Sequence, residues 1–383
     1  MENENTMKRE ALNSDSSHEQ HHQQEKETKK KKLVLLIVNC ILLSVGQVGG
    51  PMMLRLYYLH GGQRKWLSSW LQTSAFPILL IPLMVSWFKS KSKFHSQSQS
   101  TNVDHVNPGF LLTRKLFIWS VIVGIITGLD SFLFAVGYSY LPVSVASLLL
   151  ATQLAFTAVF ALVLVKQKFT PYSINSVVLL TLGAVILAFH TSSDKPIGVS
   201  KAQYFLGFFM TLGGAALLGF MLPLIEFVYA NACKVITYDL VMQMQFLVSL
   251  FATVFSTIGM LINKDFQAIS REANEYGLGE TKYYMVLVFT SILIQLSIVG
   301  YLGVIFYATS LFTGILVTLL IPIQQIFAII FFHEKFSAEK GMSLALSVWG
   351  FASYFYGEYK QTKKKTHQHK AVSTKSQEIP DEV

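Results

Sequence analysis

The chain has 383 residues, of which 52% are apolar and only 14% charged, and its mean hydropathy is +0.44. Soluble domains carry charge on about a quarter of their residues, so this composition argues against a soluble protein and indicates one that lies in lipid. The formal net charge of +9 gathers beside apolar stretches, as at Lys29–Lys32 and Lys363–Lys365. This placement is typical of contact with anionic headgroups, so we expect a lipid bilayer as partner and no nucleic acid.

Ten apolar stretches are long enough to cross a bilayer core of about 30 Å as helices. In chain order, we predict helices at 33–56, 67–88, 116–139, 142–165, 173–190, 203–229, 239–262, 284–308, 310–332 and 340–358. We expect Gly49-Gly50-Pro51 to break the first of them. Polar residues dominate 1–32 and 361–383, which we predict to be disordered cytosolic tails, and 89–110, which we predict to be a flexible cytosolic loop.

Lysine and arginine set the predicted orientation. With the N-terminus in the cytosol, 16 of them lie near cytosolic helix ends and 9 near external ends. Cytosolic segments of membrane proteins carry the excess of positive charge, so both termini are predicted to be cytosolic.

An internal repeat relates the two parts of the predicted helical region. Residues 134–190 align with 301–357 at a constant offset of 167, which pairs Tyr140 with Tyr307 and Gly183 with Gly350. Five helices in each half give the halves opposite orientations. The predicted fold is therefore an all-α membrane protein of ten transmembrane helices in two inverted five-helix repeats, 33–190 and 191–358. Inverted repeats are typical of carriers that alternate access around a midplane site.

Two acids are candidates for coupling transport to protons. Asp130 lies past the middle of the third predicted helix, far from both membrane surfaces, where an ionised group costs about 2.5–3.5 kcal/mol. It would carry a proton or bind a substrate ammonium; the alternative is a structural acid bonded to a neighbouring helix. Glu226 lies near the cytosolic end of the sixth helix and is either a gating residue or an interfacial acid.

An unusual set of glutamines lies within the spans. A glutamine offers one acceptor and two donors, which suits the edge of a nitrogen heterocycle, although each could instead bond neighbouring helices together. The predicted substrate-binding residues are Gln47, Gln72, Gln153, Gln295 and Gln325. Phe134, Tyr138 and Tyr301 are candidates for stacking on a planar solute.

The sequence contains no nucleophile elbow, phosphate-binding loop, Cys-x-x-Cys or paired His-x-x-x-His within a span. We therefore expect neither an enzyme, nor a bound metal, nor a cofactor. The spans also hold few basic residues, which disfavours an exchanger of phosphorylated solutes.

Several strings of residues resemble the plant purine permease family of the drug/metabolite transporter superfamily, across about 36–358. They are Val48-Gly49-Gly50-Pro51, Arg55-Leu56-Tyr57-Tyr58, Tyr140-Leu141-Pro142-Val143-Ser144, Thr152-Gln153-Leu154-Ala155-Phe156, Lys168-Phe169-Thr170-Pro171, His333-Glu334-Lys335-Phe336 and Trp349-Gly350-Phe351.

The resemblance implies a proton-coupled importer of adenine, cytokinins and related bases, whose usual home is the plasma membrane. Some relatives take up nicotine, pyridoxine or benzylisoquinoline alkaloids. The family commonly has glutamate where this chain has Gln72, Gln243 and Gln325, so Asp130 remains the main candidate for proton coupling.

We therefore predict a secondary transporter for a small heteroaromatic solute, with protons as the coupling ion. Uptake of plant alkaloids is the alternative within the same mechanism. From another class, a membrane receptor would bind such a ligand without moving it.

Overall fold

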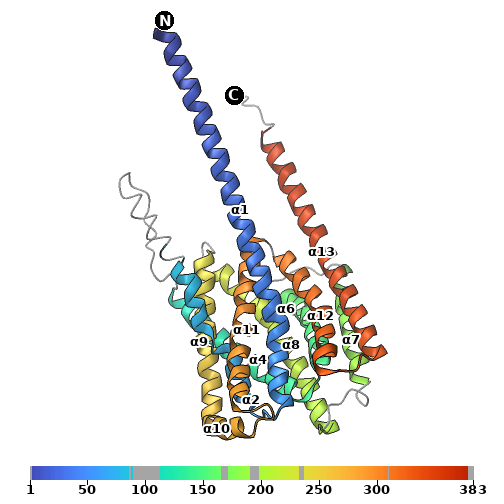
Figure 1. The fold of residues 1–383 in the computed structure, drawn as a ribbon. Coiled ribbons are helices and arrows are strands. Elements are labelled where there is room, and N and C mark those ends of the chain that lie inside the picture. Colours follow the sequence, from blue (N-terminus) through green and yellow to red (C-terminus); the bar gives the residue numbers. More distant parts are fainter. Residues whose placement is uncertain are drawn as a thin grey trace.

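The computed structural model describes residues 2–85, 88, 113–164, 171–189, 198–232, 237–308 and 310–377, and every regular element among them is helical (Figure 1). The helices are α1 (Glu2–Leu59), α2 (Lys65–Thr73), the 3-10 helix η1 (Phe76–Leu79), α4 (Arg114–Tyr140), α5 (Val143–Ala151), α6 (Gln153–Leu164), α7 (Pro171–Phe189), α8 (Lys201–Ala232), α9 (Tyr238–Ile262), α10 (Asp265–Glu275), α11 (Glu280–Tyr307), α12 (Ser310–Phe332) and α13 (Ala338–Gln377). The predicted cytosolic loop at 89–110 lies outside the described residues.

Among the residues that the structure describes, seven stretches are long and apolar enough to cross a membrane: Lys30–Leu59, Lys65–Val85, Arg114–Tyr140, Val143–Leu164, Lys201–Tyr229, Asp239–Ile262 and Glu280–Ile305. Two further apolar helices, Pro171–Ile186 and Leu319–Phe332, are shorter. The predicted all-helical class is thus confirmed for the described residues. The count of ten spans in two inverted repeats stays a prediction.

The interruptions of the helices differ from those expected. α1 runs through Pro51, so the predicted break at Gly49-Gly50-Pro51 is wrong. The span predicted at 67–88 is interrupted instead, because α2 ends at Thr73 and Pro77 lies at the start of η1, where its missing N–H costs least. The span predicted at 142–165 is divided by a turn at Thr152.

Both terminal helices continue into the segments for which composition predicts disorder. α1 begins at Glu2, and α13 continues to Gln377. Glu, Gln and Lys are good helix formers, which explains helix in such polar sequences. The proposed division into tails and two halves stays a prediction.

The spacing of small residues correctly indicates two places where helices pack closely. A Cβ atom at Gly46 of α1 would lie 2.3 Å from the carbonyl oxygen of Leu293 in α11. One at Gly124 of α4 would lie 2.8 Å from the carbonyl oxygen of Val248 in α9. Only glycine lets these backbones approach so far, as the two Gly-x-x-x-Gly patterns predict.

The helices pair in a pattern that the offset of 167 residues repeats. α1 packs along α11, and α8 packs along α4. α7 packs on α13 through reciprocal contacts: a Cβ atom at Gly183 would lie 3.2 Å from Ser343 Oγ, and one at Gly350 would lie 3.4 Å from the carbonyl oxygen of Ser176. Ser176 and Ser343 are themselves 167 positions apart. The two sides of this contact are therefore related to each other as by a local two-fold axis.

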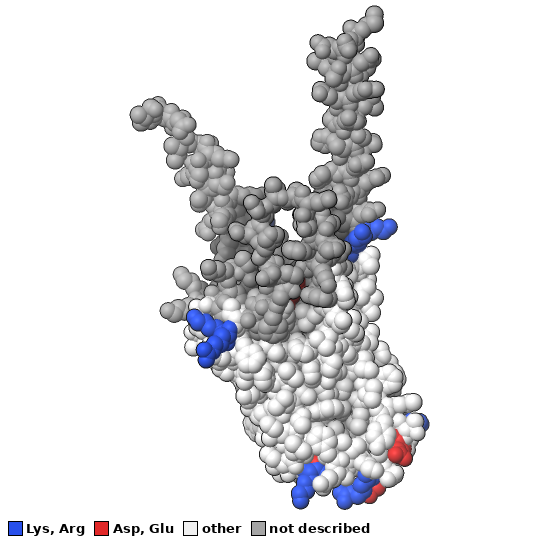
Figure 2. Space-filling model, turned by 90° about the vertical axis from the view of Figure 1, so that its left-hand side faces the viewer, with Lys and Arg blue, Asp and Glu red and all other residues white. Residues whose placement is uncertain are grey.

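The outer surface of the bundle is apolar between two charged ends. On the face shown in Figure 2, a white band separates charged residues at the lower end from lysine and arginine higher up. Large exposed apolar side chains include Ile81, Val163, Phe209, Ile262, Phe331 and Trp349. Both termini extend from one end of the bundle, whereas α10, an amphipathic helix that sequence analysis did not predict, lies at the other end (Figure 1).

Candidate functional site

α4 carries a buried stripe of one acid and two aromatic residues into the bundle. Thr113 caps the start of the helix, and its side-chain oxygen accepts the Leu116 amide at 3.4 Å. Asp130, Phe134 and Tyr138 follow at four-residue spacing, which places them on one face. Each is at most 8% exposed.

Opposite this stripe, α8 presents backbone rather than a side chain. A Cβ atom at Gly214 would lie 3.1 Å from the ring of Phe134 and 3.4 Å from Asp130 Oδ1. This oxygen of Asp130 is buried and has no hydrogen-bond partner. A carboxylate oxygen without a donor is costly in an apolar interior, so the site favours a proton or a ligand with a donor there.

Gln295 lies near the middle of α11 and is completely buried. Neither its amide nitrogen nor its carbonyl oxygen has a hydrogen-bond partner. One turn earlier on the same face, Ser291 Oγ lies 3.4 Å from Ser74 Oγ, at the interruption of the second span. Gln295 therefore offers a complete donor and acceptor pair in the interior, which no protein group uses.

Two other predicted glutamines donate hydrogen bonds to neighbouring helices. Gln72 Nε2 donates to the carbonyl oxygen of Ser131, the neighbour of Asp130, at 2.9 Å. Gln325 Nε2 donates to the Ser144 carbonyl oxygen at 2.9 Å and to Ser147 Oγ at 2.8 Å. The Oε1 atom of Gln325 is buried without a partner. Gln72 therefore stands beside the acid, whereas Gln325 joins α12 to α5.

The remaining predicted site residues differ in their surroundings. Gln47 Oε1 accepts the Ser297 hydroxyl at 3.1 Å, which joins α1 to α11. Gln153 is half-buried at the first residue of α6, directly after the Thr152 turn. Glu226 is exposed on the surface of α8. The functional roles of all these residues stay predictions.

Two charged residues that were not singled out in the sequence each contact the α4–α5 turn. Arg55 of α1 is 5% exposed, and its Nη1 donates to the Tyr138 carbonyl oxygen at 3.1 Å. Glu334, after α12, accepts the Val143 amide at 2.9 Å, the Ser144 amide at 3.2 Å and the Ser144 hydroxyl. A lone arginine inside an apolar span, such as Arg55, could have indicated this contact in the sequence, because charged residues in membrane spans usually have a partner.

At the end of the bundle where α10 lies, Arg64 joins the α1–α2 connection to α10. Its guanidinium lies 3.5 Å from Asp265 and 3.5 Å from Glu272. Glu272 also accepts the Tyr57 and Tyr283 hydroxyls. Burial raises the pKa of Asp265, although Arg64 and a hydrogen bond from Asn263 oppose this effect.

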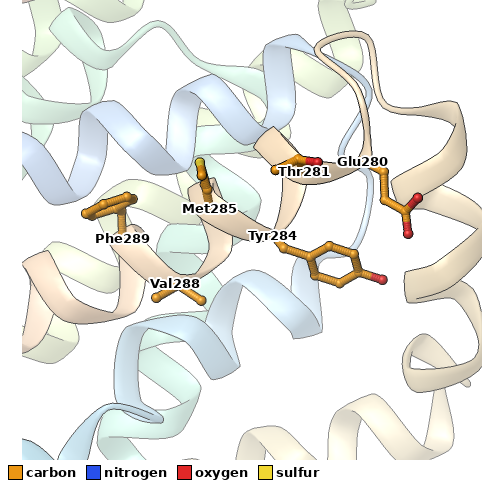
Figure 3. Close-up of a pocket in the computed structure, with 6 residues that line it drawn as sticks. All are labelled: Glu280, Thr281, Tyr284, Met285, Val288 and Phe289. Atoms are coloured by element: carbon orange, nitrogen blue, oxygen red, sulfur yellow. The ribbon is translucent and has the colours of Figure 1, made fainter.

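A hollow lies on the outer surface of α11. Its volume is about 460 Å³ (Figure 3), and its lining is Glu280, Thr281, Tyr284, Met285, Val288 and Phe289. Tyr284, Met285, Val288 and Phe289 are between 41% and 56% exposed. Because these apolar side chains face the bilayer region, the hollow is separate from the buried polar groups.

Comparison with known proteins agrees with this all-helical, membrane-spanning arrangement. The model of a family described as purine nucleobase transmembrane transport matches residues 34–364. The chain belongs to the purine permease family. Purine permease 3 of Arabidopsis thaliana is 45% identical over 345 residues, which cover 90% of this chain and 96% of that protein. Purine permease 2 of the same plant is 44% identical over 355 residues, with the same coverage.

A more distant relative, probable purine permease 11 of Arabidopsis thaliana, is 37% identical over 319 residues, which cover 83% of this chain and 81% of the relative. Membership makes the chain an integral, multi-pass membrane protein of a transporter family, and the resemblance noted in the sequence is confirmed. As a purine permease, it is a member of a family of transporters rather than of enzymes.

Proposed function

We propose that this purine permease is a proton-coupled secondary carrier, which takes up purine nucleobases, cytokinins or related nitrogen heterocycles. The observation that carries the proposal is Gln295, whose amide is fully buried with its donors and acceptor unused. A buried amide without partners costs about 1–3 kcal/mol, so a site that keeps one favours a ligand that satisfies it. The edge of a purine presents adjacent donors and acceptors.

Asp130 supplies the second polar group of the proposed site. Its Oδ1 atom lies beside Phe134 and Gly214, so a carboxyl group and an aromatic ring border the same stretch of α8 backbone. A protonated Asp130 can donate a hydrogen bond to a ring nitrogen, and an ionised one can accept a hydrogen bond from an exocyclic amine. Loss of that proton to the cytosol would couple solute movement to the proton gradient.

The pairing of helices supports alternating access between two halves. The α1–α11 pair and the α4–α8 pair correspond under the offset of 167, and Gln295 and Asp130 lie one in each pair. A solute bound by both groups would lie between two units that rock against each other.

We further propose that the carrier resides in the plasma membrane with both termini cytosolic. The excess of lysine and arginine near the predicted cytosolic helix ends supports this orientation, as does the position of both termini at one end (Figure 1). An impermeant thiol reagent applied to intact cells should label a cysteine introduced near Asp265, at the exposed Gln267, and not one introduced near Lys364. Labelling at Lys364 alone would reverse the orientation.

Uptake of labelled adenine by yeast that lacks its own purine uptake tests the function. Gln295→Leu removes the donors and the acceptor at similar size, and we expect an apparent affinity about tenfold weaker. Gln267→Leu, at an exposed position on α10, is the control and should behave as the parent. A parent that takes up no purine, or a Gln295→Leu variant with unchanged affinity, would refute the proposed substrate site. An excess of cytokinins, nucleosides or alkaloids then defines the substrate class.

The buried carboxyl of Asp130 favours a second candidate, a basic heteroaromatic alkaloid whose protonated nitrogen would pair with it. Stronger competition by alkaloids than by cytokinins would select this alternative. An exchange assay with the reconstituted protein distinguishes both carrier functions from a receptor, because only a carrier exchanges internal for external solute.

A further inference from the structure

We propose that Glu334 is the latch that closes the external side of this carrier by holding the second half of the chain on the α4–α5 turn. The inference rests on the proposed transport by alternating access. It concerns a residue that the substrate site does not use.

Glu334 binds the beginning of α5 with its whole carboxylate. One oxygen accepts the Val143 amide at 2.9 Å, and the other accepts the Ser144 amide at 3.2 Å together with the Ser144 hydroxyl. Amides in the first turn of a helix have no partner within the helix, and the helix dipole favours a negative charge there. Because Val143 and Ser144 are almost fully buried, water does not compete for these bonds in this conformation.

Arg55 completes the arrangement from the other side of the turn. Its guanidinium donates to the carbonyl oxygen of Tyr138 in the last turn of α4, where a positive charge suits the helix dipole. The negative charge of Glu334 favours the positive charge of Arg55, which lies near it. The turn between α4 and α5 is thus held by an arginine at its carbonyl end and a glutamate at its amide end.

The latch crosses the boundary between the two packed units. α12, which precedes Glu334, packs with α1 and α11 as well as with α5, whereas α5 packs with α8. Gln325 of α12 adds hydrogen bonds to Ser144 and Ser147 one step deeper along the same α12–α5 contact. The bonds of Glu334, Arg55 and Gln325 therefore all join one unit to the other.

This end of the bundle is external in the proposed orientation, since α4 ends and α5 begins there. For a solute to enter from outside, α5 must separate from α12, and the carboxylate must leave the amides of Val143 and Ser144. Water then replaces the amides and the hydroxyl as hydrogen-bond donors to the carboxylate, so breaking these bonds costs little enough for the latch to open again. A neutral side chain at position 334 would hold the turn less firmly.

Accessibility of a buried reporter tests the latch without any substrate. Ser147 is 2% exposed and one turn below Ser144, so Ser147→Cys, in a chain with Cys40→Ala and Cys233→Ala, reports opening. An impermeant thiol reagent is applied outside intact cells. We expect Glu334→Gln to raise the labelling rate about tenfold, because charge-assisted hydrogen bonds are lost. Glu275→Gln, which neutralises an exposed glutamate of α10, should leave the rate unchanged.

A second experiment keeps the inference testable if Glu334→Gln fails to reach the surface. A short bifunctional thiol reagent is applied to the double variant Ser144→Cys/Glu334→Cys in the same cysteine-free chain. We expect the cross-link to abolish uptake, and a reductant that cleaves the link to restore it. Uptake that persists in fully cross-linked protein would overturn the latch.

Labelling of Ser147→Cys at the parent rate in a well-expressed Glu334→Gln variant would also overturn it, and Glu334 would then serve only to cap α5. The two proposals fail separately. If labelling rises but no purine enters, the latch stands and the substrate is wrong. If adenine uptake depends on Gln295 while labelling is unchanged, the carrier stands without this latch.

Discussion

The glycine face of α1 permits a sharp test of helix packing, because the chain offers a matched pair of Gly→Ala changes. At Gly46, a Cβ atom would lie 2.3 Å from the carbonyl oxygen of Leu293 and 2.4 Å from the amide nitrogen of Ser297. These are backbone atoms, which cannot rotate away as a side chain would. At Gly213 of α8, the nearest atom is Leu133 Cδ1 at 3.8 Å, an ordinary contact distance.

The magnitude follows from these distances. To accept the methyl group of Gly46→Ala, α1 and α11 must separate by about 1 Å, and a gap of that size loses a quarter to a half of each dispersion contact along the interface. Overpacking of this kind costs about 1–3 kcal/mol, and we expect the upper end because backbone blocks the methyl on two sides. Gly213→Ala should instead stabilise α8 by about 0.5–1 kcal/mol through lower chain entropy.

Thermal unfolding in detergent, followed by the loss of the monodisperse peak in size-exclusion chromatography, measures the difference. The melting temperature of Gly46→Ala should fall by several degrees, while that of Gly213→Ala should equal or exceed that of the parent. Equal melting temperatures for the two variants would refute the close approach of α1 and α11. Because α1 and α11 form one of the two proposed moving units, Gly46→Ala should also reduce uptake at 37 °C more than at 20 °C.

Two further predictions concern buried acids. Asp130→Asn keeps the shape of the side chain but cannot carry a proton, so we expect the variant to lose concentrative uptake and its stimulation by external acid. Exchange of internal for external substrate should partly survive. A variant that still concentrates adenine and responds to a protonophore like the parent protein would make Asp130 structural, and the surface abundance of the variant is the control. Burial raises the pKa of Asp265 above its ordinary value of 3.8, so the folded state holds this proton more tightly than the unfolded state does and loses stability as pH rises through the raised pKa. Acidification from pH 7 toward pH 4 should therefore stabilise the parent more than Asp265→Asn in detergent melts, and identical pH profiles would show that Arg64 and Asn263 outweigh burial.

Sequence reasoning located most helices because an apolar run of about 20 residues has few other stable forms in lipid. The packing faces at Gly46 and Gly124 were also predictable, since small residues at four-residue spacing mark close contacts. The interruptions were not predictable. Pro51 and Pro77 both lack an N–H group, yet α1, which packs along α11, is continuous at Pro51, whereas the second span is interrupted at Pro77.

The candidate site was predictable by residue type more than by arrangement. Asp130 and Gln295 stand out in sequence as polar residues deep in apolar spans, and both are buried with unpartnered atoms. Gln47 looks equivalent in sequence, yet it bonds to Ser297. Glu334 follows the end of a span and reads as an ordinary surface acid, because its partners at the start of α5 are almost 200 positions away in the chain.

The reciprocal contact between α7 and α13 limits how these two helices can change. In each direction a glycine of one helix faces a serine of the other, so the surface is complementary to itself, as in a symmetric dimer. A larger residue at Gly183 would press on Ser343, and nothing at Ser176 or Gly350 would relieve it. A larger residue at Gly183 should therefore be tolerated best together with a smaller residue at position 343. The residues that one half of the chain accepts on this surface thus depend on those of the other half.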